Sequence, residues 1–174
     1  DYYQGTGKFR APHTLEVNGE TITGDTFFLC TGSKPLIPPI EGIESVAYLT
    51  SKDVFDLEKL PPSVVIVGGG YIGAELGHFL SAMGSEVTII GRNNQFIPNE
   101  DPEISAAVQR EMNNYLDLDL GLEVTKVEQL ANGEVGLTAK EGSGEARDYR
   151  ASEVLIATGR APNNELLNPE KAGI

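Results

Sequence analysis

The glycine-rich run from Gly68 to Gly73 constrains the fold of this chain more than any other feature. It follows a continuous apolar segment of strand length, Ser63-Val-Val-Ile-Val-Gly68. Apolar residues recur at helical spacing from Ile72 to Met83, and Gly84 is well placed to end that helix. Glu86–Ile90 then forms a second apolar run. The order strand, glycine turn, helix and strand predicts a βαβ unit within a parallel sheet.

Three of these glycines, Gly68, Gly70 and Gly73, have the spacing G-x-G-x-x-G. In a βαβ unit the first glycine permits a tight turn, the second lets the backbone approach a pyrophosphate, and the third allows close packing of helix on strand. The free N–H groups at the helix start then bind the phosphates. The motif therefore predicts a dinucleotide site, with Ile72 inside the motif as a further contact. An ordinary glycine-rich turn is the alternative.

The end of the second predicted strand bears on which dinucleotide is bound. An acidic residue there hydrogen-bonds the ribose 2′-hydroxyl of NAD, whereas an arginine nearby accommodates the 2′-phosphate of NADP. This chain has Gly91-Arg92 and no acid, which favours NADP(H). Glycine at position 73 and the lack of a second arginine in 93–96 leave NAD(H) open, with Arg92 then a solvated loop cation.

Patterns before the glycine turn predict β structure and two connecting segments. Residues from Phe9 to Gly32 are predicted to be β, with a hairpin at Asn18-Gly19 and a buried strand at Thr26–Thr31. Lys34–Gly42 holds three prolines and is predicted to be an extended connector. Thr50 with Asp53 resembles a capping box that starts a helix reaching about Leu60.

Patterns after the βαβ unit predict one more helix and four more strands. The helix begins at Asp101-Pro102 and reaches about Tyr115. Strands at 122–128 and 134–140, with a short third strand after a Gly-Ser-Gly turn, predict an antiparallel meander. Glu153–Thr158 is predicted to be a last buried strand. The fold class is therefore α/β, a Rossmann-type parallel sheet with an antiparallel meander.

Composition excludes several other functions. The chain has 13 Lys and Arg against 26 Asp and Glu, a formal net charge of −13, which argues against binding nucleic acid or anionic membranes. Residues 99–134 alone carry 9 acids and 2 bases, whereas 61–98 carry 2 and 1, so an anion at the glycine turn is not repelled locally. One cysteine excludes a disulfide framework, and the two histidines lack metal-ligand spacing. With neither a membrane-length apolar run nor a secretory segment at the start, we expect a cytoplasmic location.

Three ordered segments resemble one family. CTGSKP, a proline-rich connector, VVIVGGGYIGAELG and ATGRAPN are similar to the pyridine nucleotide–disulfide oxidoreductases, which include dihydrolipoamide dehydrogenase, glutathione reductase and mycothione reductase. The resemblance implies a partial FAD-domain segment at 1–45, an inserted NAD(P)-binding domain at 46–163 and a return segment at 164–174.

The resemblance also implies roles for single residues. Thr31 and Gly32 match the end of a strand in the FAD domain. Cys30 stands where an alanine is usual and is expected to be a small buried residue.

Other implied roles concern the nicotinamide nucleotide itself. Tyr71 matches an aromatic lid over the nicotinamide pocket or simply covers the helix start, and Glu75 matches a glutamate near the nicotinamide or is an exposed first-turn acid. Arg92 lies where members that use NADPH bind the phosphate, and Gly91 replaces the glutamate of members that use NADH. Gly159 matches a backbone contact near the nicotinamide.

The function implied is that of a nicotinamide-dinucleotide-binding domain in an FAD-dependent disulfide oxidoreductase, similar to dihydrolipoamide dehydrogenase. It would orient NAD(P)H for hydride exchange with FAD, and a small disulfide or dithiol would be the substrate. The redox cysteine pair and the catalytic base of the family are absent from these residues, so we expect part of a longer enzyme, with no catalytic residue here and no activity alone. The intact enzyme is expected to be a homodimer. A flavin-dependent NADH oxidase or coenzyme A-disulfide reductase, and a stand-alone dinucleotide-binding redox sensor, are the alternatives.

Overall fold

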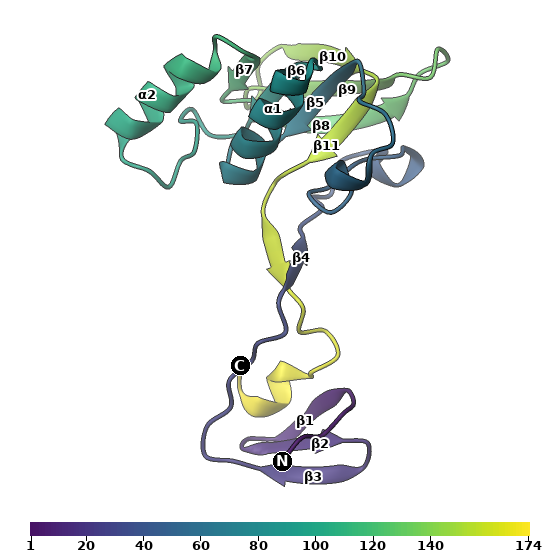
Figure 1. Cartoon of the computed structure of the whole chain (residues 1–174), viewed down its shortest axis with the longest axis vertical. Coiled ribbons are helices and arrows are strands. Elements are labelled where there is room, and N and C mark those ends of the chain that lie inside the picture. Colours follow the sequence, from purple (N-terminus) through teal and green to yellow (C-terminus); the bar gives the residue numbers. More distant parts are fainter. The chain divides into compact units, whose positions relative to one another are not determined.

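The computed structural model describes residues 1–174, and the chain divides into two compact units. One unit comprises Asp1–Lys34 together with Arg160–Ile174, and the other comprises Pro35–Gly159. The two α-helices and most strands of both units are labelled in Figure 1.

A four-stranded parallel sheet in the order β11-β5-β6-β7 forms the centre of the larger unit. Its strands are β5 (Ser63–Val67), β6 (Glu86–Gly91), β7 (Asp117–Leu120) and β11 (Glu153–Ile156). β5, β6 and β11 are almost wholly buried, as expected for strands covered on both faces. The predicted α/β fold with a parallel sheet is confirmed.

Two helices cover one face of this sheet. α1 (Tyr71–Met83) joins β5 to β6, and α2 (Pro102–Met112) joins β6 to β7. Alternate residues of β5 point to this side, where Val64 and Ile66 pack with Leu76 and Leu80 of α1. Gly84 ends α1 in the left-handed conformation, with φ +113°, and its N–H donates to the last carbonyls of the helix.

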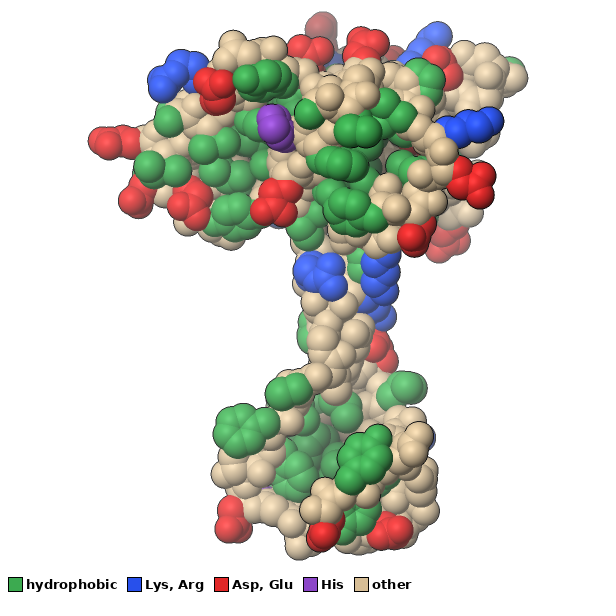
Figure 2. Space-filling model, viewed as in Figure 1, with side chains coloured by type: hydrophobic (Ala, Val, Ile, Leu, Met, Phe, Trp, Pro, Cys, Tyr) green, Lys and Arg blue, Asp and Glu red, His purple; other side chains and the backbone are tan.

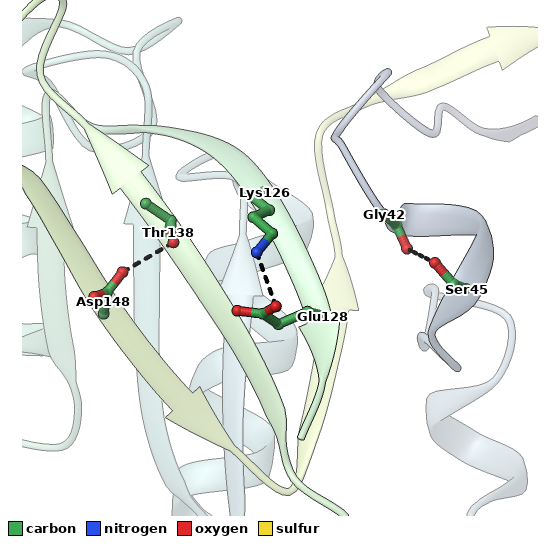
Figure 3. A network of polar contacts seen from close by, with 6 residues as sticks. All are labelled: Gly42, Ser45, Lys126, Glu128, Thr138 and Asp148. Atoms are coloured by element: carbon green, nitrogen blue, oxygen red, sulfur yellow. Dashed lines mark hydrogen bonds and ion pairs between the residues drawn. The ribbon is translucent and has the colours of Figure 1, made fainter. Parts of the chain in front are cut away.

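The antiparallel meander covers the other face. It consists of β8 (Glu123–Gln129), β9 (Val135–Lys140) and β10 (Ala146–Ala151), and its apolar side packs against Val65 and Val67 of β5. Exposed polar pairs, such as Thr138 with Asp148, lie on its strands (Figure 3). The larger unit therefore has three layers, which are helices, parallel sheet and meander.

The remaining elements of the larger unit precede β5. They are two short 3₁₀ turns, η1 (Ile43–Ser45) and η2 (Val54–Asp56). In η1 the Ser45 hydroxyl donates to the Gly42 carbonyl over 2.9 Å (Figure 3). None of the helices in the chain combines the length and apolar character that crossing a membrane requires.

The smaller unit is built from a three-stranded antiparallel sheet, a two-stranded sheet and one 3₁₀ turn. The first sheet is β1 (Gly7–Ala11), β2 (Thr14–Val17) and β3 (Glu20–Thr23), with the predicted hairpin turn between β2 and β3. The second pairs β4 (Ser33–Pro35) with β12 (Arg160–Pro162), and η3 (Pro169–Ala172) follows. Phe9 is buried here, and its N–H donates to the Leu167 carbonyl over 2.7 Å.

The prediction of a buried strand at Thr26–Thr31 is wrong. These residues form no strand, Phe28 is 88% exposed, and Cys30 is exposed rather than buried. An apolar run indicates a tendency to be buried, but a strand forms only where a neighbouring strand pairs with its backbone. No strand of this structure pairs with 26–31.

The predicted helix from Thr50 to Leu60 is also wrong. The capping contacts exist, because Asp53 accepts hydrogen bonds from both the N–H and the hydroxyl of Thr50 at 2.7 Å. Only η2 follows, since so short a segment cannot offset the cost of helix nucleation without a packed apolar face. α2 likewise ends at Met112 and does not reach Tyr115.

The glycines of α1 allow a test of how closely this helix packs. A Cβ at position 73 would lie 2.1 Å from the Gly68 carbonyl oxygen, whereas one at position 77 would meet only side-chain ends, the nearest being Cδ1 of Ile89 at 2.8 Å. We predict that Gly73→Ala lowers the free energy of unfolding by about 2–3 kcal/mol through overpacking. Gly77→Ala, the matched control, should change it by less than about 1 kcal/mol because better helix propensity offsets the tighter contact. Urea unfolding of the chain measures both, and equal losses would contradict the prediction.

Candidate functional site

A cleft of about 500 Å³ lies in the larger unit, where the carboxyl ends of β5, β6 and β11 meet. Strand order reverses here, because β6 follows β5 on one side and β11 lies on the other. Such a switch point is where open α/β sheets bind ligands. The cleft is lined by five segments, which are the connector at 36–40, the β5–α1 turn at 67–72, the residues at 90–99, those at 122–124, and those that follow β11 at 157–159.

The β5–α1 turn brings backbone rather than side chains to the cleft. Gly68 has φ +125°, and a Cβ there would lie 2.3 Å from the carbonyl oxygen of Ala157. Gly70 differs, because nothing lies within 4 Å of the place its Cβ would take. The turn is therefore packed tightly beneath Gly68 and open to the cleft at Gly70.

Hydrogen-bond donors without partners lie at the start of α1. The first bond of the helix runs from the Ala74 N–H to the Gly70 carbonyl over 2.9 Å, so the N–H groups of residues 71–73 have no acceptor within the helix. No side chain caps this end, and the first turn contains no acidic residue. Free N–H groups and the positive end of the helix dipole together favour an anion at this point.

Two charged side chains, Arg92 and Glu123, are the only ones among the lining residues. A guanidinium nitrogen of Arg92 lies 4.0 Å from a carboxylate oxygen of Glu123, and the two side chains are 78% and 64% exposed. The backbone fixes this proximity, since the Leu122 N–H donates to the Gly91 carbonyl over 3.0 Å. The charges of the cleft walls therefore cancel.

Tyr71, at the start of α1, is partly exposed and lines the cleft. Its hydroxyl donates a hydrogen bond to the carboxylate of Glu100, which raises the pKa of Tyr71 because the phenolate would lose that bond. The loop that carries Glu100 is itself held, since the Ile97 N–H donates to the Gly69 carbonyl over 2.7 Å. Tyr71 is thus tied to the loop that follows β6, whose residues 97–99 line the cleft.

The structure brings most of the predicted site residues together. Those that line the cleft are Gly68, Gly70, Tyr71, Ile72, Gly91, Arg92 and Gly159. Gly73 packs beneath Gly68 instead, as its predicted packing role requires.

Three other predicted site residues do not line the cleft. Glu75 is exposed and lies in the second turn of α1 rather than the first. Thr31 and Gly32 belong to the smaller unit, where their carbonyls accept hydrogen bonds from Asn163 at 3.0 Å.

Glu123 is the charged lining residue that the sequence analysis missed. The acidic excess of residues 99–134 was expected to lie away from the glycine turn, but Glu123 belongs to that stretch and reaches the cleft. Its place depends on the pairing of residues 121 and 122 with the segment after β6, which no local pattern encodes.

Comparisons with known proteins agree with this architecture. The sequence profile of a family described as pyridine nucleotide-disulphide oxidoreductase matches residues 1–174. Similar proteins include a mercuric reductase of Staphylococcus aureus, 39% identical over 100% of this chain and 32% of that protein, and a dihydrolipoyl dehydrogenase of Vibrio cholerae, 34% identical over 98% and 36%. The chain thus spans about a third of the length of these curated relatives.

A solved structure is similar along nearly the whole chain. The copper(II) complex of an HOCl-induced flavoprotein disulfide reductase, RclA from Escherichia coli, matches with a TM-score of 0.80 and 31% identity. The match covers 98% of this chain and 38% of RclA.

The Tyr71–Glu100 contact gives a prediction about titration. We expect Glu100→Gln to lower the pKa of Tyr71, because a neutral amide opposes the phenolate less than a carboxylate does. The hydrogen bond supports the folded form below the ordinary pKa of tyrosine, and this contribution is lost as the pH rises through the raised value. Carbon-13 NMR of tyrosine-labelled chain, assigned with Tyr71→Phe, measures the shift. Glu103→Gln, which removes an exposed acid of α2, should leave it unchanged; the same pKa in the Glu100 variant would rule the contact out.

Proposed function

Because the chain belongs to the pyridine nucleotide-disulphide oxidoreductase family, we propose that its cleft binds a nicotinamide dinucleotide within an FAD-dependent disulfide oxidoreductase similar to dihydrolipoamide dehydrogenase. The observation that carries this proposal is the glycine turn, which leaves Gly70 open and directs the unpartnered N–H groups of α1 to the carboxyl edge of the sheet.

The residues of the cleft fit such a ligand. A pyrophosphate placed against Gly70 accepts hydrogen bonds from the helix N-terminus without meeting a side chain. The adenosine ribose then lies toward the end of β6, where Arg92 is found, and the nicotinamide lies toward β11 and Gly159. Tyr71, held by Glu100, borders the path between the two ends.

The coenzyme proposed is NADP(H), with NAD(H) as the alternative. Arg92 is exposed at the end of β6 and is the only cation that lines the cleft. A guanidinium binds phosphate through charge-assisted hydrogen bonds, which suits a ribose 2′-phosphate.

The proposed enzyme also contains FAD, and Thr31 and Gly32 of the smaller unit are proposed to contact it. When bound, the nicotinamide supplies or accepts a hydride, and the role of this chain is to bind and orient it. The relatives named for dihydrolipoyl dehydrogenase and the flavoprotein RclA support a flavin and a small disulfide or dithiol substrate. A homodimeric, cytoplasmic enzyme remains the proposal for the whole protein.

A second candidate substrate is the mercuric ion. Three relatives with identities of 35% to 39% are named mercuric reductase. The test is NADPH oxidation by the intact enzyme with mercuric ion compared with lipoamide or glutathione disulfide. NADPH oxidation with a disulfide but not with mercuric ion would exclude mercuric ion as the substrate.

Gly70 gives a test that separates binding from folding. We predict that Gly70→Ala weakens the binding of both NADPH and NADH at least about tenfold, because its methyl group occupies the place where a pyrophosphate approaches. The free energy of unfolding should change by no more than about 1 kcal/mol, since the Cβ meets no atom within 4 Å and only a helix-cap preference is lost. Calorimetric titration and urea unfolding of the 174-residue chain measure the two effects. Unaltered affinity in a folded variant would contradict the proposed site.

Arg92 gives a test of the coenzyme. We predict that Arg92→Ala weakens NADPH binding by about 1.5–3 kcal/mol through loss of a charge-assisted bond and leaves NADH binding unchanged. Titration of the chain with each coenzyme measures this, and Arg110→Ala, which removes a cation from the last turn of α2, is the control. Equal losses for both coenzymes would show that Arg92 has another role, and tenfold tighter NADH binding by the unaltered chain would identify NAD(H) as the coenzyme.

A further inference from the structure

The ion pair at the rim of the cleft carries an inference that rests on the proposed function. Arg92 follows β6 directly, so its guanidinium marks the position where a Rossmann-type site meets the 2′ substituent of the adenosine ribose. Glu123 opens β8, and its carboxylate lies 4.0 Å from that guanidinium. Any group that binds against Arg92 therefore lies close to Glu123 as well.

Glu123 is held in this position by the backbone and not by the ion pair alone. Gly121 and Leu122 donate N–H hydrogen bonds to the carbonyls of Asn93 and Gly91, at 3.1 and 3.0 Å. Gly121 has φ +75°, and a Cβ there would lie 2.3 Å from the amide oxygen of Asn94. The two segments are thus packed at backbone contact distance, and a substitution of Glu123 leaves that packing intact.

Charge determines what Glu123 does to each coenzyme. A 2′-phosphate bound by Arg92 places negative charge near a second negative charge in a cleft that holds no other cation. An unphosphorylated ribose meets the same carboxylate as a hydrogen-bond acceptor for its 2′-hydroxyl, the role usually filled by an acid at the end of the second strand. Here β6 ends at Gly91 and is followed by Arg92, and the acid that lies near this position is Glu123 at the start of β8.

We propose that Glu123 is a specificity-determining residue. Its carboxylate repels the ribose 2′-phosphate of NADPH and accepts a hydrogen bond from the ribose 2′-hydroxyl of NADH. It acts against Arg92, so the unaltered chain discriminates between NADPH and NADH less than Arg92 alone would allow. The pair is exposed, and its effect therefore decreases at high ionic strength.

The experiment measures dissociation constants of the 174-residue chain for NADPH, NADH, 2′,5′-ADP and 5′-AMP. The two shorter probes, 2′,5′-ADP and 5′-AMP, differ only in the 2′-phosphate and do not reach the nicotinamide end. We expect Glu123→Gln to bind NADPH and 2′,5′-ADP about three- to tenfold more tightly, as removal of one nearby like charge allows. Binding of NADH and 5′-AMP should weaken, because their 2′-hydroxyl loses a carboxylate acceptor, and the NADPH gain should shrink between low and high salt.

Glu128→Gln is the matched control, because it removes one negative charge from the same strand at a residue that does not line the cleft. Its carboxylate accepts from the Lys126 ammonium over 2.8 Å (Figure 3). An equal gain in NADPH affinity in this control would show that the effect comes from the net charge of the chain and would overturn the proposal. Weaker NADPH binding by Glu123→Gln would also overturn it, since Glu123 would then hold Arg92 in place for the phosphate.

The same measurements distinguish failure of the Glu123 proposal from failure of the proposed function. If the unaltered chain binds the coenzymes and Glu123→Gln leaves their ratio unchanged, the role of Glu123 is refuted and dinucleotide binding stands. If the unaltered chain binds none of the four probes, the proposed function fails and the role of Glu123 fails with it.

Discussion

The contact between the end of β5 and the start of α1 is the constraint on which the site depends. A side chain at position 73 would collide with the Gly68 carbonyl oxygen, and one at position 68 would collide with that of Ala157. Three segments, the ends of β5 and β11 and the first turn of α1, therefore meet with no room for side chains. The polar groups they leave at the carboxyl edge of the sheet are backbone N–H groups, which hold their direction because the packing beneath them is rigid.

Elements whose signals lie within a few residues were predictable. β5, α1, β6 and the Asn18-Gly19 hairpin follow from apolar runs, helical spacing and glycine turns, and the structure has all four. Thr26–Thr31 failed for the opposite reason, because whether an apolar segment forms a strand depends on a partner that its own residues do not specify. Apolar residues are not always buried either, because hydrophobic side chains gather on the visible faces of both units (Figure 2). The large exposed ones include Phe28, Phe55 and Met83.

The residues of the site also divide into those that local sequence patterns predict and those that depend on contacts distant in sequence. The glycine motif identified the turn and the helix start, and Arg92 followed from its position after β6. Glu123 could not be found this way, since its proximity to Arg92 arises from hydrogen bonds between two loops distant in sequence. The sequence analysis also missed β7, because its alternation of Asp and Leu is only four residues long. Asp119 of this strand accepts a hydrogen bond from the Tyr149 hydroxyl of the meander, a contact between residues distant in sequence. Burial and that bond raise the pKa of Tyr149 to about 12.

To bind the proposed anionic coenzyme, a chain of net charge −13 must supply positive potential locally. The side chains of the cleft do not supply it, because the charges of Arg92 and Glu123 cancel, so in the proposed function the attraction for a pyrophosphate comes from the N-terminus of α1. In the proposed site, affinity for the part common to both coenzymes and discrimination at the ribose are thus assigned to different groups. The direction of the backbone groups is set by packing that substitutions at Gly68 or Gly73 would disrupt, whereas the side chains of Arg92 and Glu123 are largely exposed. Coenzyme preference can therefore change through substitutions at the rim while the glycine turn stays fixed.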